Sequence, residues 1–171
     1  MITGGGSGLG QSTALRLAEE KVNIVVVDIS EKGGNETVEM VKKLGVEAIF
    51  IKADVSKQED VKNYVDQTVE QFGKIDYFFN NAGISGSGSY FLDSSIEEIE
   101  QIVGINLLGA LYGVRYVAEV MLKNGGGSIV NTASSAGVIG QDSVVTYSAT
   151  KHGIVGLTKS MVAEYGKDGL R

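Results

Sequence analysis

Hydrophobic and polar residues alternate along the chain with two different spacings. Short apolar runs, typical of strands buried on both faces, lie near residues 1–3, 23–28, 47–52, 75–80 and 127–132. Between them, apolar residues recur every three to four positions, which predicts helices near residues 8–20, 31–44, 56–72, 95–123 and 146–166. Strands that alternate with helices predict a parallel sheet covered on both faces, so we expect an α/β fold.

A glycine-rich loop, TGGGSGLG at residues 3–10, joins the first expected strand to the first expected helix. Backbone N–H groups at the start of a helix lack intrahelical partners and carry partial positive charge. Glycine lets a phosphate approach these groups closely. The order of strand, glycine loop and helix therefore indicates a phosphate-binding site near the start of the chain.

The spacing of the glycines separates three versions of such a loop. The nucleoside-triphosphatase pattern fits Gly5 and Gly10, but Gln11 stands where that chemistry needs lysine. The common dinucleotide fingerprint G-x-G-x-x-G fails because its third glycine position is filled by Leu9, Gln11 or Thr13. The remaining pattern is a threonine and glycine, three further residues, and then Gly-Leu-Gly.

An acidic residue, Asp28, ends the second expected strand, twenty residues after Gly8. A carboxylate at this point can accept hydrogen bonds from the hydroxyls of an adenosine ribose and would repel a 2′-phosphate. Neither Ser7 nor Ile29 offers the cation that a 2′-phosphate would need. This pattern favours NAD over NADP, although an acidic residue at a strand end can also be an ordinary solvated terminus.

Tyr147 and Lys151 lie four residues apart in an expected helix, so their side chains share one face. A free phenol loses its proton near pH ~10, and an adjacent fixed cation favours the phenolate. Such a tyrosine can exchange a proton with an alcohol or carbonyl if a hydroxyl such as that of Ser134 fixes the substrate oxygen. Alone, this spacing is a weak signal, because many helices carry a packed tyrosine and a solvated lysine four residues apart.

Taken together, these motifs resemble the short-chain dehydrogenase/reductase family in its classical branch. The resemblance covers essentially all 171 residues, and the stretches FFNNAG, IVNTAS and ATKHGIVGLT are particularly similar to levodione reductase-type members. The matching elements occur in the family's order and spacing: TGGGSGLG at 3–10, Asp54-Val55, NNAG at 80–83, Asn106 within GINLLG, Ser134 within SIVNTASSAG, and Tyr147 with Lys151.

The resemblance implies a Rossmann-like, doubly wound parallel sheet with strand order 3-2-1-4-5. It also implies that residues 1–171 form a single NAD(P)-binding domain that is incomplete. Compared with the family pattern, the chain begins inside the first central strand and stops before the last two strands and the substrate lid. The expected fold is therefore truncated at both ends, and the activity of the chain by itself is left open.

The resemblance also assigns residues to cofactor binding. The carboxylate of Asp54 would hold the adenine amino group while the Val55 backbone contacts the ring, although Asp54 could equally cap the helix that follows. The amide of Asn81 would tie neighbouring backbone together. The full set of expected cofactor-binding residues is Thr3, Gly4, Ser7, Gly8, Leu9, Gly10, Asp28, Asp54, Val55, Asn81, Ala82, Gly83, Tyr147 and Lys151.

The implied reaction transfers a hydride between NAD(H) and a secondary alcohol or ketone. Tyr147 would be the general base in oxidation and the acid in reduction, and Lys151 would stabilise the phenolate and hold the nicotinamide ribose. Ser134 would donate a hydrogen bond to the reacting oxygen. Asn106, an unfavoured residue inside a helix, would distort that helix and anchor a water that reaches the lysine. His152 points away from this face and is expected to be packing or surface.

Composition excludes several other classes of function. A net charge of −6 and a pI near 4.8 make nucleic acid an improbable partner. With no cysteine and one histidine, the chain has no thiolate or zinc site. No apolar run approaches the ~20 residues of a membrane span, so we expect a cytoplasmic protein without a membrane partner. A helix at 146–166 that lacks a covering partner would expose apolar area, which favours a homo-oligomer.

Three alternatives stay open at this point. The chain could be a catalytically impaired fragment that binds the nucleotide without turnover. A sugar-nucleotide epimerase or dehydratase of the extended branch can share the Tyr and Lys spacing, but it usually has glycines spaced G-x-x-G-x-x-G. A Rossmann-like methyltransferase would explain the glycine loop and the acidic strand end, but it leaves Ser134, Tyr147 and Lys151 without a role.

Overall fold

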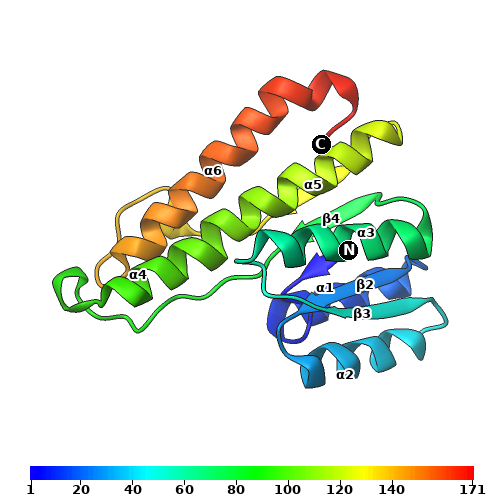
Figure 1. The fold of residues 1–171 in the computed structure, drawn as a ribbon, viewed down its shortest axis with the longest axis horizontal. Helices are drawn as coiled ribbons and strands as arrows, with labels where there is room; N and C mark the ends of the chain where they lie inside the picture. Colours follow the sequence, from blue (N-terminus) through cyan, green and yellow to red (C-terminus); the bar gives the residue numbers. More distant parts are fainter.

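The computed structural model describes residues 1–171 and contains one five-stranded parallel sheet (Figure 1). The strand order is β3-β2-β1-β4-β5. The sheet confirms both the α/β fold and the predicted order. The strands span Ile2–Thr3 (β1), Ile24–Asp28 (β2), Ala48–Lys52 (β3), Tyr77–Asn80 (β4) and Ser128–Asn131 (β5).

The helices lie between the strands, within two or three residues of their predicted bounds. An additional 3-10 turn, Ser135–Gly137 (η3), follows β5. The helices span Gly8–Glu19 (α1), Glu31–Lys42 (α2), Gln58–Phe72 (α3), Ile96–Val103 (α4), Gly109–Lys123 (α5) and Val145–Tyr165 (α6).

Each face of the sheet packs against its own helices, because successive strand residues point to opposite sides. Val25 and Val27 of β2 belong to the cluster formed with α3 and α5, against which α6 also packs. Ile24 and Val26 belong to the cluster formed with α1 and α2. β1 and β2 are thereby buried on both faces, as the sequence pattern predicted, whereas β5 has no buried residue and its Val130 is 57% exposed.

The expected helix at 95–123 is continuous but not regular. Residues Gly104–Leu108 (η2) form a π-helical segment between α4 and α5, and Asn106 lies in its middle. In Figure 1, α4 and α5 run beside α6 and extend beyond the sheet. By length and composition, the run Ile96–Lys123 could cross a membrane, with 44% of its most apolar window buried. The expectation that no run reaches this length was therefore wrong, although α5 packs against α3 and η2 packs against α6 as core helices do.

Candidate active site

A hollow of about 540 Å³ opens at the carboxyl ends of the strands. Ligands of open parallel sheets bind at this edge, beside the point where the chain stops adding strands on one side of β1 and begins adding them on the other. Most of the residues expected to bind cofactor line this hollow together: Gly4, Ser7, Gly8, Leu9, Asp28, Asp54, Val55, Asn81, Ala82, Gly83, Tyr147 and Lys151.

A larger hollow, of about 660 Å³, lies at the opposite, amino ends of the strands. Its lining is mainly apolar and includes Leu17, Ile24, Phe72 and Tyr77. None of the residues expected to carry chemistry lines it. We therefore place the candidate active site in the smaller hollow, where the glycine loop, strand-end carboxylates and the Tyr147–Lys151 pair converge.

The glycine loop leaves no room for a side chain beneath its turn. A Cβ on Gly10 would lie 2.1 Å from the Gly4 carbonyl oxygen, a clash with backbone that no rotamer can relieve. Gly4 itself has φ +64°, in the left-handed region that favours glycine. Thr3 and Gly10 are buried below the hollow and do not line it. They fix the loop, while Ser7, Gly8 and Leu9 stand exposed at its mouth.

Asp28 lies at the end of β2 and lines the hollow. One carboxylate oxygen accepts a hydrogen bond from the Gly6 N–H at 2.8 Å, and the other accepts one from the Ser30 N–H at 2.8 Å. These bonds orient the carboxylate against the glycine loop. Each oxygen keeps a further lone pair that a ribose hydroxyl could use.

Asp54 follows β3, and its carboxylate accepts hydrogen bonds from a nearby residue of the same loop. Its Oδ1 accepts from the Ser56 N–H at 3.0 Å and from the Ser56 hydroxyl at 2.7 Å, which starts the turn that leads into α3. The prediction that Asp54 caps α3 was wrong, because the residue before α3 is Lys57 and no side chain caps the helix. Asp54 instead orders the turn before the helix and lines the hollow. Val55 packs closely on α5, because a Cβ on Gly109 would lie 2.9 Å from the Val55 carbonyl oxygen.

Asn81 joins three neighbouring strand ends. Its Nδ2 donates to the Thr3 carbonyl oxygen at 3.2 Å, and its Oδ1 accepts from the Thr132 hydroxyl at 3.1 Å. The Thr3 hydroxyl in turn accepts from the N–H groups of Asn81 and Ala82, at 2.9 and 3.1 Å. These bonds hold the ends of β1, β4 and β5 together, so the floor of the hollow is built by long-range contacts.

Tyr147 and Lys151 lie on the first turns of α6 and both line the hollow. The Lys151 Nζ is 5.5 Å from the centre of the Tyr147 ring, within the range of a cation–π contact. Lys151 is 4% exposed, and burial lowers the pKa of its ammonium. Its Nζ donates to the Thr132 carbonyl oxygen at 2.7 Å, which holds the cation beside the ring.

Asn106 is buried, and its amide closes a reciprocal pair of hydrogen bonds with one backbone unit. Its Oδ1 accepts from the Ile84 N–H at 2.8 Å and its Nδ2 donates to the Ile84 carbonyl oxygen at 2.7 Å. The π-helical segment brings this amide to the chain that leaves β4. The side chain therefore fixes the segment after Gly83, close to but not lining the hollow.

Ser134 lies between β5 and η3 and lines neither hollow. Its Oγ accepts a hydrogen bond from the Ala136 N–H at 3.2 Å. The turn that it starts packs tightly on α6, because a Cβ on Gly137 would lie 2.6 Å from the Lys151 carbonyl oxygen. Ser134 is thereby held against the helix that carries Tyr147 and Lys151. His152 is exposed on that helix, as expected, and its Nδ1 lies 2.9 Å from the Ser148 carbonyl oxygen.

Sequence reasoning missed several residues of the hollow. Thr132 is the most informative, because its carbonyl and hydroxyl contact Lys151 and Asn81. Its place directly after β5 was a signal that could have found it, since parallel strands end at one edge. The other missed residues are Ser85, Ile29, Ala53, Ile84 and Ile105. Of these, only Ser85 has a polar side chain that could have indicated a site.

Comparison with known proteins places the chain in a family. The model of the short chain dehydrogenase family matches residues 1–171. The levodione reductase of Leifsonia aquatica is 43% identical over 100% of this chain and 65% of its own length. The cyclohexanol dehydrogenase of an Acinetobacter strain is 42% identical over 100% of this chain and 68% of its own length.

Solved structures agree with these relatives. The levodione reductase crystal structure superposes with a TM-score of 0.96 at 43% identity, over 99% of this chain and 67% of that one. An NAD⁺-bound xylitol dehydrogenase superposes with a TM-score of 0.96 at 36% identity, over 99% of this chain and 65% of that one. The chain thus spans about two thirds of the length of these relatives. It belongs to the short-chain dehydrogenase/reductase family.

Proposed function

We propose that this protein is an oxidoreductase that uses NAD and acts on a secondary alcohol or ketone through Ser134, Tyr147 and Lys151. The observation that carries the proposal is the position of Tyr147 and Lys151 in the same hollow as the glycine loop and Asp28. Residues 1–171 would act as one nucleotide-binding unit. The names of the relatives, which include reductases and dehydrogenases of cyclic compounds, agree with this chemistry.

The residues of the hollow fit a dinucleotide. The first turn of α1 starts at Gly8, on the exposed loop, and its free N–H groups suit a pyrophosphate. The tight packing of Gly10 against the Gly4 backbone keeps the loop compact, so a pyrophosphate could come close to its N–H groups. Asp28 would accept hydrogen bonds from the adenosine ribose and repel a 2′-phosphate, so NAD is favoured over NADP. Asp54 and Val55 stand where an adenine would lie, and Asn81, Ala82 and Gly83 form the floor.

When bound, the nicotinamide would take a hydride from the carbinol carbon of an alcohol or give one to a carbonyl carbon. The phenol oxygen of Tyr147 would take the alcohol proton in oxidation and return it in reduction. The ammonium of Lys151 would place a positive charge beside the Tyr147 ring, and burial strengthens its field because little water screens the charge. The Thr132 carbonyl would keep the ammonium oriented toward the ring.

Two further residues complete the proposed machinery. The Ser134 hydroxyl would donate a hydrogen bond to the substrate oxygen while its Oγ still accepts from the Ala136 N–H, because a hydroxyl can do both at once. Asn106 would support proton movement indirectly. Its amide is committed to Ile84, so its contribution is to hold the wall of the site and the π-helical segment in place.

The proposal is tested by following a hydrogen isotope. The chain is incubated with NAD⁺ and cyclohexanol that carries deuterium on the carbinol carbon, and the nicotinamide is analysed by mass spectrometry. We expect one deuterium to appear in the reduced cofactor, together with NADH absorbance. Binding of NADH is measured separately by fluorescence. Bound cofactor without transfer from any of a panel of secondary alcohols would contradict the proposal and favour a nucleotide-binding fragment.

A further inference from the structure

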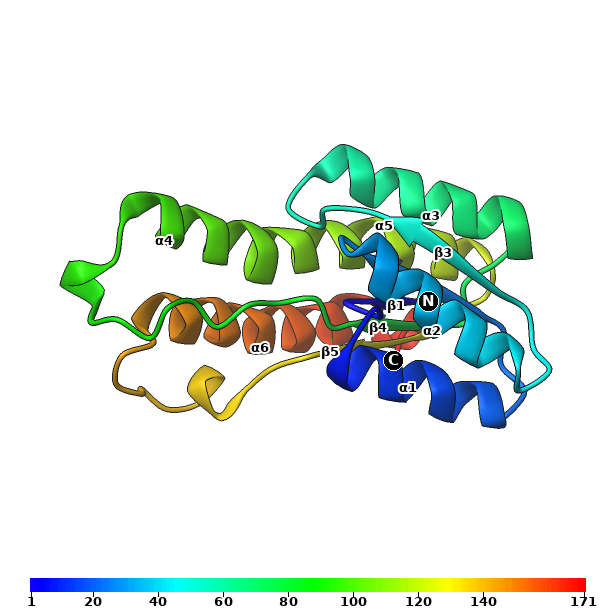
Figure 2. The same cartoon turned by 90° about the horizontal axis from the view of Figure 1, so that it is seen from below.

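Two segments flank the proposed reacting end of the site, residues 83–95 after β4 and residues 132–146 after β5. In Figure 2 both run toward the end of the molecule where α4 and α6 begin. They meet there, because Ser85, Ser87 and Phe91 share a small hollow of about 20 Å³ with Val144 and Tyr147. Tyr147 therefore lies where the two segments meet, as well as in the hollow of the candidate active site.

The two segments carry no cation. Residues 83–95 contain one charged side chain, Asp93, and residues 132–146 contain one, Asp142. Neither segment has a lysine, arginine or histidine. The cation beside Tyr147 is Lys151, which is buried and already bound to the Thr132 carbonyl. An anionic substrate group would thus find no positive side chain in the two segments.

A third carboxylate, that of Glu98, is fixed where the segments meet. Its Oε1 accepts a hydrogen bond from the Ser87 N–H at 2.6 Å, and it lines the same small hollow as Tyr147. This bond from the Ser87 backbone lowers the pKa of Glu98 below its ordinary value of 4.5. The group is therefore ionised at neutral pH and places a negative charge beside the path to the reacting end.

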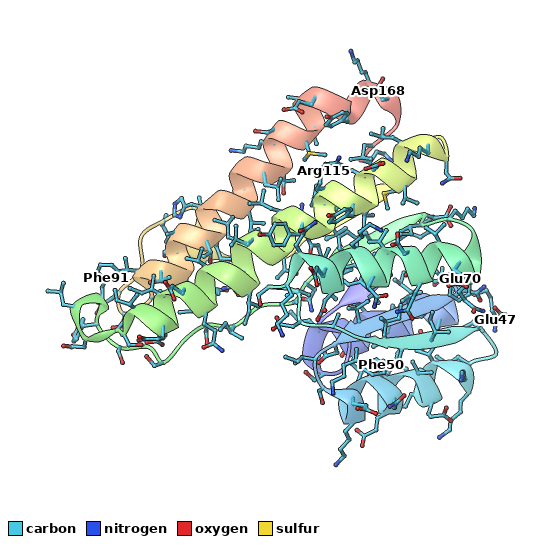
Figure 3. All side chains as sticks on the ribbon, in the orientation of Figure 1. Glu47, Phe50, Glu70, Phe91, Arg115 and Asp168 are labelled. Carbon is cyan, nitrogen blue, oxygen red and sulfur yellow. The ribbon has the colours of Figure 1, made fainter.

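The two segments also expose apolar side chains, of which Phe91 lines the small hollow. Val138 and Ile139 are 71% and 59% exposed, and Phe91 and Leu92 are 44% and 93% exposed. Figure 3 shows Phe91 at the tip of the molecule, beside the starts of α4 and α6. These side chains offer contact to an apolar substrate body and no hydrogen bond to a charged one.

We infer that the site selects uncharged, predominantly apolar secondary alcohols and ketones, and discriminates against substrates that carry a carboxylate or phosphate group. The inference rests on the proposed function and narrows it. A phosphate or carboxylate normally requires arginine, lysine or free backbone N–H groups for recognition. The free N–H groups at the glycine loop are assigned to the cofactor, and the two segments add no cationic side chain.

The test compares two alcohols that differ in one charge. The chain with saturating NAD⁺ is assayed with 4-hydroxycyclohexanecarboxylate and with its methyl ester, at low ionic strength. We expect kcat/KM for the ester to exceed that for the carboxylate by about tenfold, and the ratio to fall as salt screens the acidic groups. Equal values, or a preference for the carboxylate, would overturn the inference while leaving the proposed function intact.

Matched variants separate the role of Glu98 from general surface charge. Glu98→Gln keeps a hydrogen-bond acceptor for Ser87 and removes the charge, so the ester-to-carboxylate ratio should fall about threefold. Glu100→Gln changes an exposed residue of α4 outside the small hollow and should leave the ratio unchanged. An equal effect of both variants would contradict the local charge argument. Loss of turnover of both alcohols in the native chain, with NADH still bound, would instead refute the proposed function.

Discussion

The glycine-loop side of the site and the substrate-facing segments are built in opposite ways. On the glycine-loop side, Gly10 has no space for a methyl group, and Asn81 and Thr3 bond across the ends of the central strands. On the other side, residues 83–95 are largely exposed, and the Ser87 N–H to Glu98 bond is one of few that tie them to a helix. Backbone packing from several elements holds the first region, whereas residues 85–95 depend mainly on side-chain contacts such as that of Glu98.

This difference separates what the fold fixes from what side chains can adjust. Nucleotide binding and proton transfer depend on residues that are held in place by packing and that leave no space for a larger side chain. Substrate choice depends on exposed side chains whose replacement should change selectivity without unfolding the protein. We therefore expect substitutions in the first region to cost binding or turnover by large factors, and substitutions of exposed side chains in residues 85–95 to shift ratios between substrates.

The largest expected effect belongs to the buried lysine. Lys151→Met keeps a long apolar stem but removes the charge beside Tyr147, so turnover should fall about 1000-fold. Lys159→Met, at an exposed position of the same helix, serves as the control and should keep native turnover. The two variants are compared by NADH production with NADH binding measured in parallel. A Lys151→Met rate within about tenfold of native would show that the charge is not needed.

A smaller but still large effect is expected from Gly10→Ala. The added methyl would overlap the Gly4 carbonyl oxygen, so the loop must shift, at a cost of about 1–3 kcal/mol in the free energy of unfolding. NADH affinity should fall by about 30-fold or more because the loop no longer fits the pyrophosphate. Gly156→Ala, in α6 with open space around it, is the control and should stabilise by about 0.5–1 kcal/mol. Thermal unfolding and NADH fluorescence give the two quantities.

The cofactor preference should change by about one order of magnitude in Asp28→Asn. The variant keeps one oxygen for the Gly6 or Ser30 N–H but removes the charge that would repel a 2′-phosphate. The ratio of NADPH to NADH affinity should therefore rise about tenfold. Asp76→Asn removes an exposed charge at the other edge of the sheet and should leave the ratio unaltered. An unchanged ratio in Asp28→Asn would mean that this carboxylate does not choose the cofactor.

The smallest effect concerns pH and the segment after β4. The pKa of Glu98 is lowered by its bond from Ser87, so its contribution to stability is present above pH 4.5 and is lost as pH falls through the lowered value. The amide signal of Ser87 in NMR spectra should titrate with a midpoint below 4.5. Glu98→Gln should abolish that titration. A midpoint at or above 4.5 would show that the bond does not hold the segment in solution.

Much of the architecture was predictable from the sequence, because local spacing determines it. The apolar runs gave each strand to within two residues, and the four-residue spacing of Tyr147 and Lys151 placed both in one hollow. The residues predicted at the ends of the parallel strands also lie close together, because the carboxyl ends of those strands share one edge of the sheet. The spacing of the glycines was enough to separate the loop from other phosphate-binding loops.

The remaining features depend on contacts between distant residues, which spacing does not encode. The bond from Lys151 to the Thr132 carbonyl uses backbone, and every residue except proline offers the same carbonyl and N–H groups. The π-helical segment lies where Asn106 bonds Ile84; helical periodicity alone predicted an unbroken helix, and the family resemblance predicted the distortion at Asn106. The bond between Glu98 and Ser87 links a helix to an irregular segment that has no pattern of its own. Such contacts become visible only when the fold brings the segments together.

The most direct measurement of the central claim is turnover by Tyr147→Phe. Phenylalanine keeps the ring that packs beside Lys151 and removes only the oxygen that would carry the proton. We predict that NADH production from a secondary alcohol falls by about 1000-fold while NADH binding changes by less than about threefold. Turnover at the native rate by Tyr147→Phe would contradict the proposed role of the Tyr147 and Lys151 pair.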